Sequence, residues 1–302
     1  MNSLKYSPLT LALALVALQT SAAPAYKSAA DILAASAASD WRPLDPANTL
    51  YMQLPGGRVV MELAPGFVPL HAANIKTLVR EKYFDGLAVI RVQDNYVAQW
   101  GDPNEDEPSS KSLGTALTKV DPEFSVPVSA ATPFTRLADG DVYAPQVGFG
   151  GGFPAARDKG GKQTWLTHCY GAVGVARGND PMGGSGSGLY VIIGHAPRHL
   201  DRNVTVVGRV VQGIELLSAL PRGTGPLGFY EKPEQRVPIS SIRLAADVPL
   251  AERTPLEVLR TDSATFAAVT EARRNRRDDW TVNPAGHIEL CNVPLPVRPL
   301  KR

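Results

Sequence analysis

The sequence predicts a mainly β protein, an antiparallel barrel whose ends are closed by helices. Two segments have the pattern of β-hairpins, and a helical pattern lies between them. Further strand-like segments follow in the second half of the chain, together with a short helical pattern. A chain of 302 residues that is 44% hydrophobic and 20% charged can bury a sizeable core in one domain with appended segments.

Residues 1–22 have the features of a secretory signal peptide. Lys5 precedes an apolar run over residues 9–18, and small residues follow that run. The run is too short to span a membrane, and we expect cleavage after Ala22, with Ala25 as the alternative. The mature protein is therefore expected to be periplasmic or secreted and to have no membrane association after cleavage.

The remaining elements can be placed in chain order. Residues 23–46 are rich in alanine and predict an N-terminal helix or tether. The first hairpin occupies residues 48–63 around a Pro-Gly-Gly turn, and apolar residues then recur at helical spacing over 68–79. The second hairpin spans 87–100. Later strands are expected at 170–177, 188–194, 204–211 and 239–246, with a short helix at 213–220.

The barrel domain is expected to span residues 47–247. Two regions do not follow its pattern, an insertion within this span and the segment that follows it. Residues 104–168 have no regular periodicity, and a structureless loop of that length is unusual in a compact domain. We expect this insertion to wrap the body as a partly ordered excursion. Residues 248–302 form a C-terminal extension, with one helix over 262–276 that is capped by Asp262 or Ser263.

Several tempting motifs do not fit a catalytic or binding role. The net charge of +2 does not favour nucleic acid, and we expect none as a partner. Glycine-rich residues 148–153 and 183–188 match neither the phosphate-binding nor the dinucleotide-binding spacing, and the second also fails the serine-nucleophile spacing. His195 and His199 lie four apart, but Pro197 interrupts them and no third ligand is nearby. We expect neither a metal nor a cofactor.

The chain has two cysteines, Cys169 and Cys291. Two such cysteines can become oxidised in a protein that leaves the reducing compartment. The sequence therefore predicts a disulfide that fixes the C-terminal extension to the barrel. The alternative is two buried free thiols, because unpaired cysteine is often found in cores.

Arg91 is the polar residue that most requires an explanation. It lies in an apolar alternation, where a buried guanidinium without a partner is costly. It could be an edge residue, half of a structural ion pair, or part of a site. Gln99, eight residues later, could likewise be an ordinary polar strand residue.

The segment YFDGLAVIRVQDNYVAQWGDP, residues 83–103, resembles the cyclophilin segment in which Y-x-G, F-H-R and G-F-M-x-Q-G-G-D-P build the site of a peptidyl-prolyl cis-trans isomerase. YGAVGVARGNDP and LDRNVTVVGRVVQGIELL resemble two later cyclophilin blocks. The resemblance covers roughly residues 48–103 and 170–246. It implies a closed eight-stranded antiparallel β-barrel capped by two helices, and isomerase activity without a cofactor.

The resemblance also implies roles for individual residues. Arg91 would be the catalytic arginine, and Gln99 would orient it and the bound peptide carbonyl. The implied substrate-binding residues are Tyr96, Val97, Ala176, Tyr190, Leu200 and His199. The sequence departs from the family at three places. Val204 replaces a histidine, His199 replaces a tryptophan, and Gly188 or Leu189, depending on a one-residue gap, replaces a glutamine. Activity is therefore expected to be weaker or differently selective.

The function that follows from this resemblance is rotation of X-Pro bonds in exported polypeptides, which assists their folding. Pro-containing polypeptides would be the partners, and the protein would act as a monomer. The alternative is a catalytically weak or inactive cyclophilin-like module that binds Pro-containing segments as a chaperone or scaffold. A further alternative is a structural role in which the insertion and the extension dock a partner.

Overall fold

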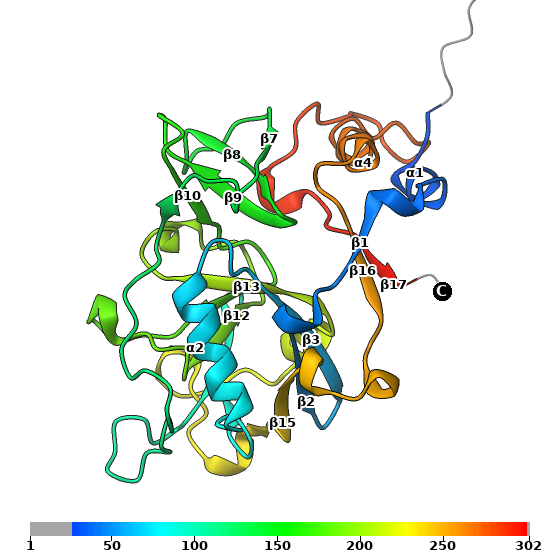
Figure 1. Cartoon of the computed structure of the whole chain (residues 1–302). Coiled ribbons are helices and arrows are strands. Elements are labelled where there is room, and N and C mark those ends of the chain that lie inside the picture. The colour runs from blue at the N-terminus through cyan, green and yellow to red at the C-terminus, as the bar shows by residue number, and fades with distance from the viewer. Residues whose placement is uncertain (1–25, 301–302) are drawn as a thin grey trace, which may run out of the picture.

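The computed structural model describes residues 26–300, and its largest sheet is antiparallel and curls around the main apolar core (Figure 1). The mainly β class predicted from the sequence is confirmed. In spatial order the strands of this sheet are β14 (Val237–Pro238), β4 (Ala88–Val92), β5 (Val97–Gly101), β12 (Leu189–Ile192), β11 (Ala172–Val175), β13 (Val206–Gln212), β3 (Gly57–Leu63), β2 (Thr49–Leu54) and β15 (Ser241–Leu244).

The sheet is not the closed eight-stranded barrel that the sequence predicts. It has nine strands, and among residues 26–300 no ladder joins the two edge strands, β14 and β15. Both edges come from one segment, which changes partner between them. The amide of Ile239 donates to Leu87 on the β4 side at 2.8 Å, and the amide of Ser240 donates to Gln53 on the β2 side at 3.0 Å. This change of partner separates β14 from β15, and the strand expected at 239–246 is reduced to β15 (Ser241–Leu244).

Two helices contribute to the main core. Helix α2 (Pro69–Arg80) begins with a proline in its first turn and buries Ile75, Leu78 and Val79 at helical spacing. Each such side chain contributes about 1.5–3 kcal/mol when fully buried. Helix α3 (Glu215–Ser218) is a single turn that buries Leu217. Of the two expected helices, α2 is therefore the longer and buries more of its residues against the main core.

The insertion folds into its own antiparallel sheet, which lies beyond one end of the large sheet (Figure 1). Its strands, in spatial order, are β6 (Val126–Pro127), β10 (Gln163–Leu166), β9 (Phe153–Arg157), β8 (Gln146–Gly150) and β7 (Thr135–Leu137). It is more regular than the predicted excursion. One position of β8 must be glycine, since a Cβ at Gly148 would lie 2.1 Å from the carbonyl oxygen of Thr135 on β7. Glycine adds no apolar side chain to the strand, so the alternating pattern is weak in the sequence.

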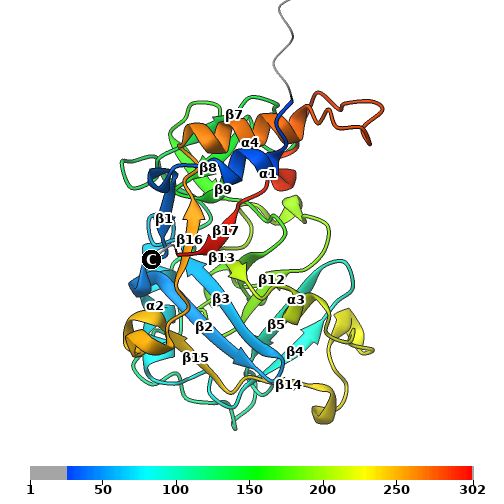
Figure 2. The same ribbon diagram turned by 90° about the vertical axis from the view of Figure 1, so that its right-hand side faces the viewer.

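The N-terminal and C-terminal segments fold together. They form a three-stranded sheet of β1 (Trp41–Pro43), β16 (Leu256–Leu259) and β17 (Val297–Pro299). Helix α1 (Ala29–Ala34) lies beside helix α4 (Ala264–Arg274) in Figure 2, and the Tyr26 hydroxyl donates to the carbonyl of Ala272. Ser263 caps α4, as one of the two predicted candidates, by accepting from the amide of Phe266 at 3.1 Å.

Short 3₁₀ helices connect these elements. They lie at Ala38–Asp40, Pro46–Asn48, Pro181–Gly183, Arg198–Leu200, Pro226–Gly228, Pro233–Gln235, Ala245–Asp247, Leu250–Glu252 and Leu290–Asn292. Within the described residues, no helix has the length and apolar character needed to cross a membrane. The predicted signal peptide, residues 1–22, lies outside the described residues.

A second apolar cluster joins the insertion to the extension. Phe149 of β8 meets Phe266 of α4 edge to face, with ring centroids 5.0 Å apart, and Trp41 and Leu290 are buried in the same cluster. The predicted disulfide is present beside this cluster, between Cys169 and Cys291, whose Cα atoms are 5.0 Å apart. The extension is thus held by a crosslink as well as by packing.

Reduction of this disulfide is expected to loosen the extension more than the large sheet. The bond joins residues 122 positions apart, and the chain-entropy model assigns about 4–5 kcal/mol to a loop of this length. Hydrogen exchange should show faster exchange in α4, β16 and β17 after reduction, with smaller changes in β3 and β13. The Cys169→Ser/Cys291→Ser variant is the control and should not respond to reductant. Two titratable thiols in the denatured, unreduced protein would contradict the crosslink.

Candidate active site

One row of residues crosses four neighbouring strands of the large sheet. Arg91 on β4 pairs with Gln99 on β5, Gln99 pairs with Tyr190 on β12, and Tyr190 pairs with Gly174 on β11. Directly opposed residues on antiparallel strands have neighbouring side chains, so the register alone brings these positions together.

A β-bulge sets the direction of Arg91. The β4–β5 register shifts between Val89 and Arg91, while Val89 and Val92 are both fully buried in the core. Bulges bend a strand and redirect a side chain, and here the extra residue lets Arg91 face away from the core. On β5, simple alternation places Val97 and Gln99 on one face, while Trp100 faces the core.

The Arg91 guanidinium is held by neutral oxygen atoms. Its Nε donates to the carbonyl of Leu227 at 2.7 Å, and its Nη1 donates to Oε1 of Gln99 at 3.0 Å. Its Nη2 donates to Oε1 of Gln93. A guanidinium has five N–H groups, so N–H groups on both Nη1 and Nη2 remain for a ligand.

The charge of Arg91 is not neutralised by a carboxylate in the described part of the chain. Burial lowers the pKa of Arg91, and the nearby Tyr96 opposes that change. The guanidinium carbon lies 5.7 Å from the ring centroid of Tyr96 and 5.4 Å from that of Phe229, within the range of a cation–π contact. The guanidinium is thus held from several sides by neutral groups.

A cavity of about 410 Å³ opens beside this guanidinium. It is lined by Arg91, Tyr96, Val97, Gln99, Val175, Ala176, Arg177, Tyr190, Leu200, Val204, Leu227 and Phe229. One part is therefore cationic and amide-bearing, while the rest is largely apolar. Such a cavity can enclose a small apolar ring and donate hydrogen bonds to its polar neighbours.

The structure brings together all but one of the site residues predicted from the sequence. Ala176 directly follows β11, and Leu200 ends a 3₁₀ helix. His199 is the exception, because it is exposed and does not line the cavity. Neighbouring residues point in different directions around a 3₁₀ helix, so Leu200 faces the cavity and His199 does not. The carbonyl of His199 instead accepts from the side chain of Asn203 at 3.1 Å.

Tyr190 forms a buried part of the cavity wall. Its ring lies over Gly174, and its hydroxyl is 2.8 Å from Nε2 of His168. Burial raises the pKa of the Tyr190 hydroxyl, which therefore stays protonated. The ring can occupy this place because Gly174 has no side chain.

Three residues that hold Arg91 were missed by sequence reasoning. Gln93 could have been found, since it lies two positions from Arg91 and neighbouring same-face positions in a strand have this spacing. Leu227 and Phe229 had no comparable signal. They come from a loop more than 130 residues later in the chain, and Leu227 lies in it with a left-handed φ of 56°.

Comparisons with known proteins agree on one family. The model described as "Cyclophilin type peptidyl-prolyl cis-trans isomerase/CLD" matches residues 49–244. A probable peptidyl-prolyl cis-trans isomerase of Brucella suis biovar 1 (strain 1330) is 29% identical over 181 residues, which cover 60% of this chain and 74% of the relative. A putative thylakoid lumen peptidyl-prolyl cis-trans isomerase of Synechocystis is 27% identical over 163 residues, covering 51% of this chain and 39% of that protein.

Among solved structures, the cyclophilin AquaCyp293 from Hirschia baltica is similar, with a TM-score of 0.68 and 26% sequence identity. The match covers 89% of this chain and 96% of that chain. A match of this extent continues beyond residues 49–244, so the two proteins share part of the segments that flank the family model.

Gly174→Ala is expected to destabilise the protein and displace the Tyr190 ring. The new Cβ would lie 2.3 Å from Cζ of Tyr190, and overpacking of this kind typically costs about 1–3 kcal/mol. Urea unfolding and the aromatic NMR signals of Tyr190 measure the two effects. Gly178→Ala is the matched control, because a Cβ there would meet nothing within 4 Å. Equal stability of the two variants would contradict the expected close contact.

Proposed function

We propose that this chain, which belongs to the cyclophilin-type peptidyl-prolyl cis-trans isomerase family, rotates X-Pro bonds in the cavity beside Arg91. The observation that carries the proposal is the arrangement of Arg91 itself. Its guanidinium is held by the neutral oxygens of Gln99 and Leu227, keeps unused N–H groups, and borders an apolar cup.

The chemistry needs a hydrogen-bond donor rather than a proton transfer. An X-Pro bond rotates slowly because its partial double bond gives a barrier of about 18–20 kcal/mol. In the twisted transition state the prolyl nitrogen regains its lone pair. An N–H group of Arg91 aimed at that nitrogen stabilises the twisted state more than either planar state, which is the condition for catalysis.

The cup holds the substrate while its bond rotates. In this proposal the apolar side chains of Val97, Leu200 and Val204 and the rings of Tyr96 and Tyr190 enclose the proline ring. Gln99 accepts from Arg91 through its Oε1 atom, so its NH₂ group can donate to the carbonyl of the bound peptide.

The isomerase domain in this proposal comprises residues 47–247, with the insertion at 104–168. Residues 23–46 and 248–302 flank it. We further propose that the protein acts in the periplasm or outside the cell and assists the folding of exported polypeptides. The signal-like residues 1–22 support this location, as does a disulfide of the kind that persists in oxidising compartments.

Arg91→Ala is expected to lower kcat/KM for short X-Pro peptides about 10²- to 10³-fold, the usual loss when one donor to a transition state is removed. Arg91→Lys should lie between the wild type and Arg91→Ala, because an ammonium keeps the charge but lacks the planar set of donors. NMR exchange or a protease-coupled assay measures the rates. Arg260→Ala is the control, since Arg260 pairs with Asp262 in the extension and does not line the cavity.

Equal rates for the wild type, Arg91→Ala and buffer would refute the enzymatic proposal. If Pro-containing peptides still bound under those conditions, the chain would be a binding module for such segments. The replacement of the family's histidine by Val204 in the cavity wall is the observation that favours this second function.

Export is tested separately. The protein secreted or released from the periplasm of a bacterial host is expected to begin at Ala23, or at Tyr26 if cleavage follows Ala25. N-terminal sequencing or intact mass measures this. Replacing the apolar run at residues 9–18 with polar residues should retain the uncleaved chain in the cytoplasm. An uncleaved wild type in the cytoplasm would refute the proposed location.

A further inference from the structure

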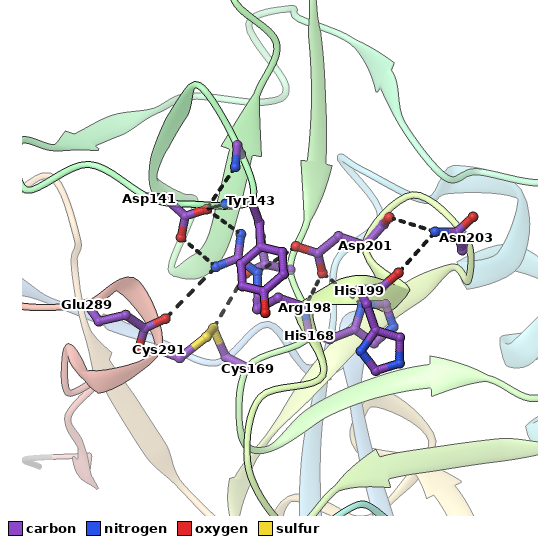
Figure 3. A network of polar contacts seen from close by, with 12 residues as sticks. Asp141, Tyr143, His168, Cys169, Arg198, His199, Asp201, Asn203, Glu289 and Cys291 are labelled. Atoms are coloured by element: carbon purple, nitrogen blue, oxygen red, sulfur yellow. Dashed lines mark hydrogen bonds and ion pairs between the residues drawn. A yellow bond between two sulfur atoms is a disulfide. The ribbon is translucent and has the colours of Figure 1, made fainter.

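A chain of buried polar contacts leads from the cavity wall into the insertion. The hydroxyl of Tyr190 lies 2.8 Å from Nε2 of His168, and Nδ1 of His168 lies 3.0 Å from Oδ1 of Asp201. Oδ2 of Asp201 accepts from Nε of Arg198 at 2.6 Å. Both Nη atoms of Arg198 donate to the carboxylate of Asp141, at 2.8 and 3.1 Å. Figure 3 shows Arg198 between the two carboxylates.

The contacts at His168 determine which nitrogen carries a proton. A carboxylate only accepts hydrogen bonds, so Nδ1 of His168 donates to Asp201. In the neutral ring Nε2 is then an acceptor, and the hydroxyl of Tyr190 donates to it. The backbone amide of His168 also donates to Asp201, at 2.9 Å, which fixes the position of the imidazole.

These groups are shielded from solvent. The exposed fractions of the side chains are 0% for His168, 1% for Arg198, 3% for Asp141 and 8% for Asp201. Burial alone disfavours a charged guanidinium, but Asp201 and Asp141 outweigh it and raise the pKa of Arg198. Removing one partner from such a buried pair is costly, because it leaves an unpaired charge.

The series of contacts is anchored at two places, one near Asp141 and one next to His168. Asp141 lies in the loop between β7 and β8, and two residues earlier Asp139 accepts from Arg274 of α4 at 2.6 Å. Cys169, adjacent to His168, forms the disulfide with Cys291, and both sulfur atoms lie beside the network in Figure 3. The insertion and the extension therefore hold the chain of contacts against the large sheet.

We propose that His168 is a positioning residue of the isomerase site, which fixes the Tyr190 ring in the wall of the cavity, and that Arg198 and Asp141 fix His168 in turn through Asp201. The inference rests on the proposed function, since it assigns Tyr190 to the proline-binding wall. A phenylalanine ring at this position would lack this anchor and would leave Nε2 of His168 without its hydrogen-bond partner.

The proposal predicts an effect on substrate binding rather than on the chemical step. The Tyr190 ring touches the proline ring in both the planar and the twisted state, so its displacement weakens both equally. A change of this kind raises KM and leaves kcat unchanged. Loss of the Arg91 donor should instead lower kcat, because that interaction is stronger in the twisted state than in the planar states.

A double-mutant cycle tests the proposal. His168→Asn retains an amide near Nδ1 that can donate to Asp201 but removes the acceptor for Tyr190, and Tyr190→Phe removes the hydroxyl. One net hydrogen bond corresponds to roughly a two- to tenfold change, so each single variant is expected to raise KM by about that factor, with kcat within about twofold of wild type. The double variant should be no worse than the worse single variant, because it leaves no unpaired partner.

The controls separate positioning from general destabilisation. Glu257→Gln breaks a partly buried ion pair with Arg298, 2.5 Å long, in the sheet of β16 and β17, and should lower stability without changing KM. Asp141→Asn, at the far end of the contacts, should raise KM in the same direction as His168→Asn. It remains informative if His168→Asn does not fold.

Unchanged KM in the folded His168→Asn and Asp141→Asn variants would overturn the proposal, as would KM increases that multiply in the double variant. Failure of the proposed function gives a different result, namely a wild type without turnover. In that case the same cycle, measured as the Kd of a short Ala-Pro peptide, still tests whether His168 holds the Tyr190 wall: coupled losses of affinity support it, and independent or absent losses overturn it.

Discussion

The antiparallel register of β4, β5, β12 and β11 is the constraint on which the candidate site depends. It places Arg91, Gln99, Tyr190 and Gly174 in one row, so that four neighbouring strands contribute to one cavity. A slip of one residue between two strands would turn every side chain of the moved strand to the other face. The apolar core behind the row prevents such a slip, because Val89, Trp100 and Val191 are fully buried there.

Within this row the positive charge is arranged so that it remains available. A carboxylate beside Arg91 would form an ion pair and occupy the N–H groups that a substrate needs. The neutral oxygens of Gln99, Gln93 and Leu227 orient the guanidinium without neutralising it. Arg198 differs in this respect, because two buried aspartates, Asp141 and Asp201, pair with its guanidinium and occupy its donors. The identity of the partners therefore separates Arg91, which keeps N–H groups for a ligand, from Arg198, whose donors are occupied by aspartates.

The parts of the site that are local in sequence could be predicted. Strand alternation shows that Arg91, Tyr96, Val97 and Gln99 lie in one hairpin, and the resemblance to cyclophilins assigned them to the site. The 3₁₀ geometry that turns His199 away from Leu200 is not visible in this way. Nor is the loop that brings Leu227 and Phe229 to Arg91, because tertiary packing, rather than periodicity, places an irregular segment.

The fold shows the same division between local pattern and tertiary contact. The first hairpin and α2 follow from turn residues and helical spacing. The sheet of the insertion does not, because Gly148 is required by the close approach of β7 and contributes no apolar side chain to an alternating pattern. The divided last strand was equally invisible, since the change of partner at Ile239 and Ser240 depends on both neighbouring strands.

The insertion and the extension are best understood as a second body that is held against the cavity wall. Their apolar cluster, which includes Phe149 and Phe266 and is joined by Trp41 of the N-terminal segment, is built without residues of the cavity. Phe153, Ala155 and Leu166 of the insertion pack into the main core, and the paired Arg198 and the disulfide next to His168 add polar and covalent connections near the site. Apolar contacts tolerate small sliding, whereas a bidentate guanidinium–carboxylate pair and a covalent bond fix geometry. A connection of this kind can hold a wall residue such as Tyr190 in one position, which packing alone does less strictly.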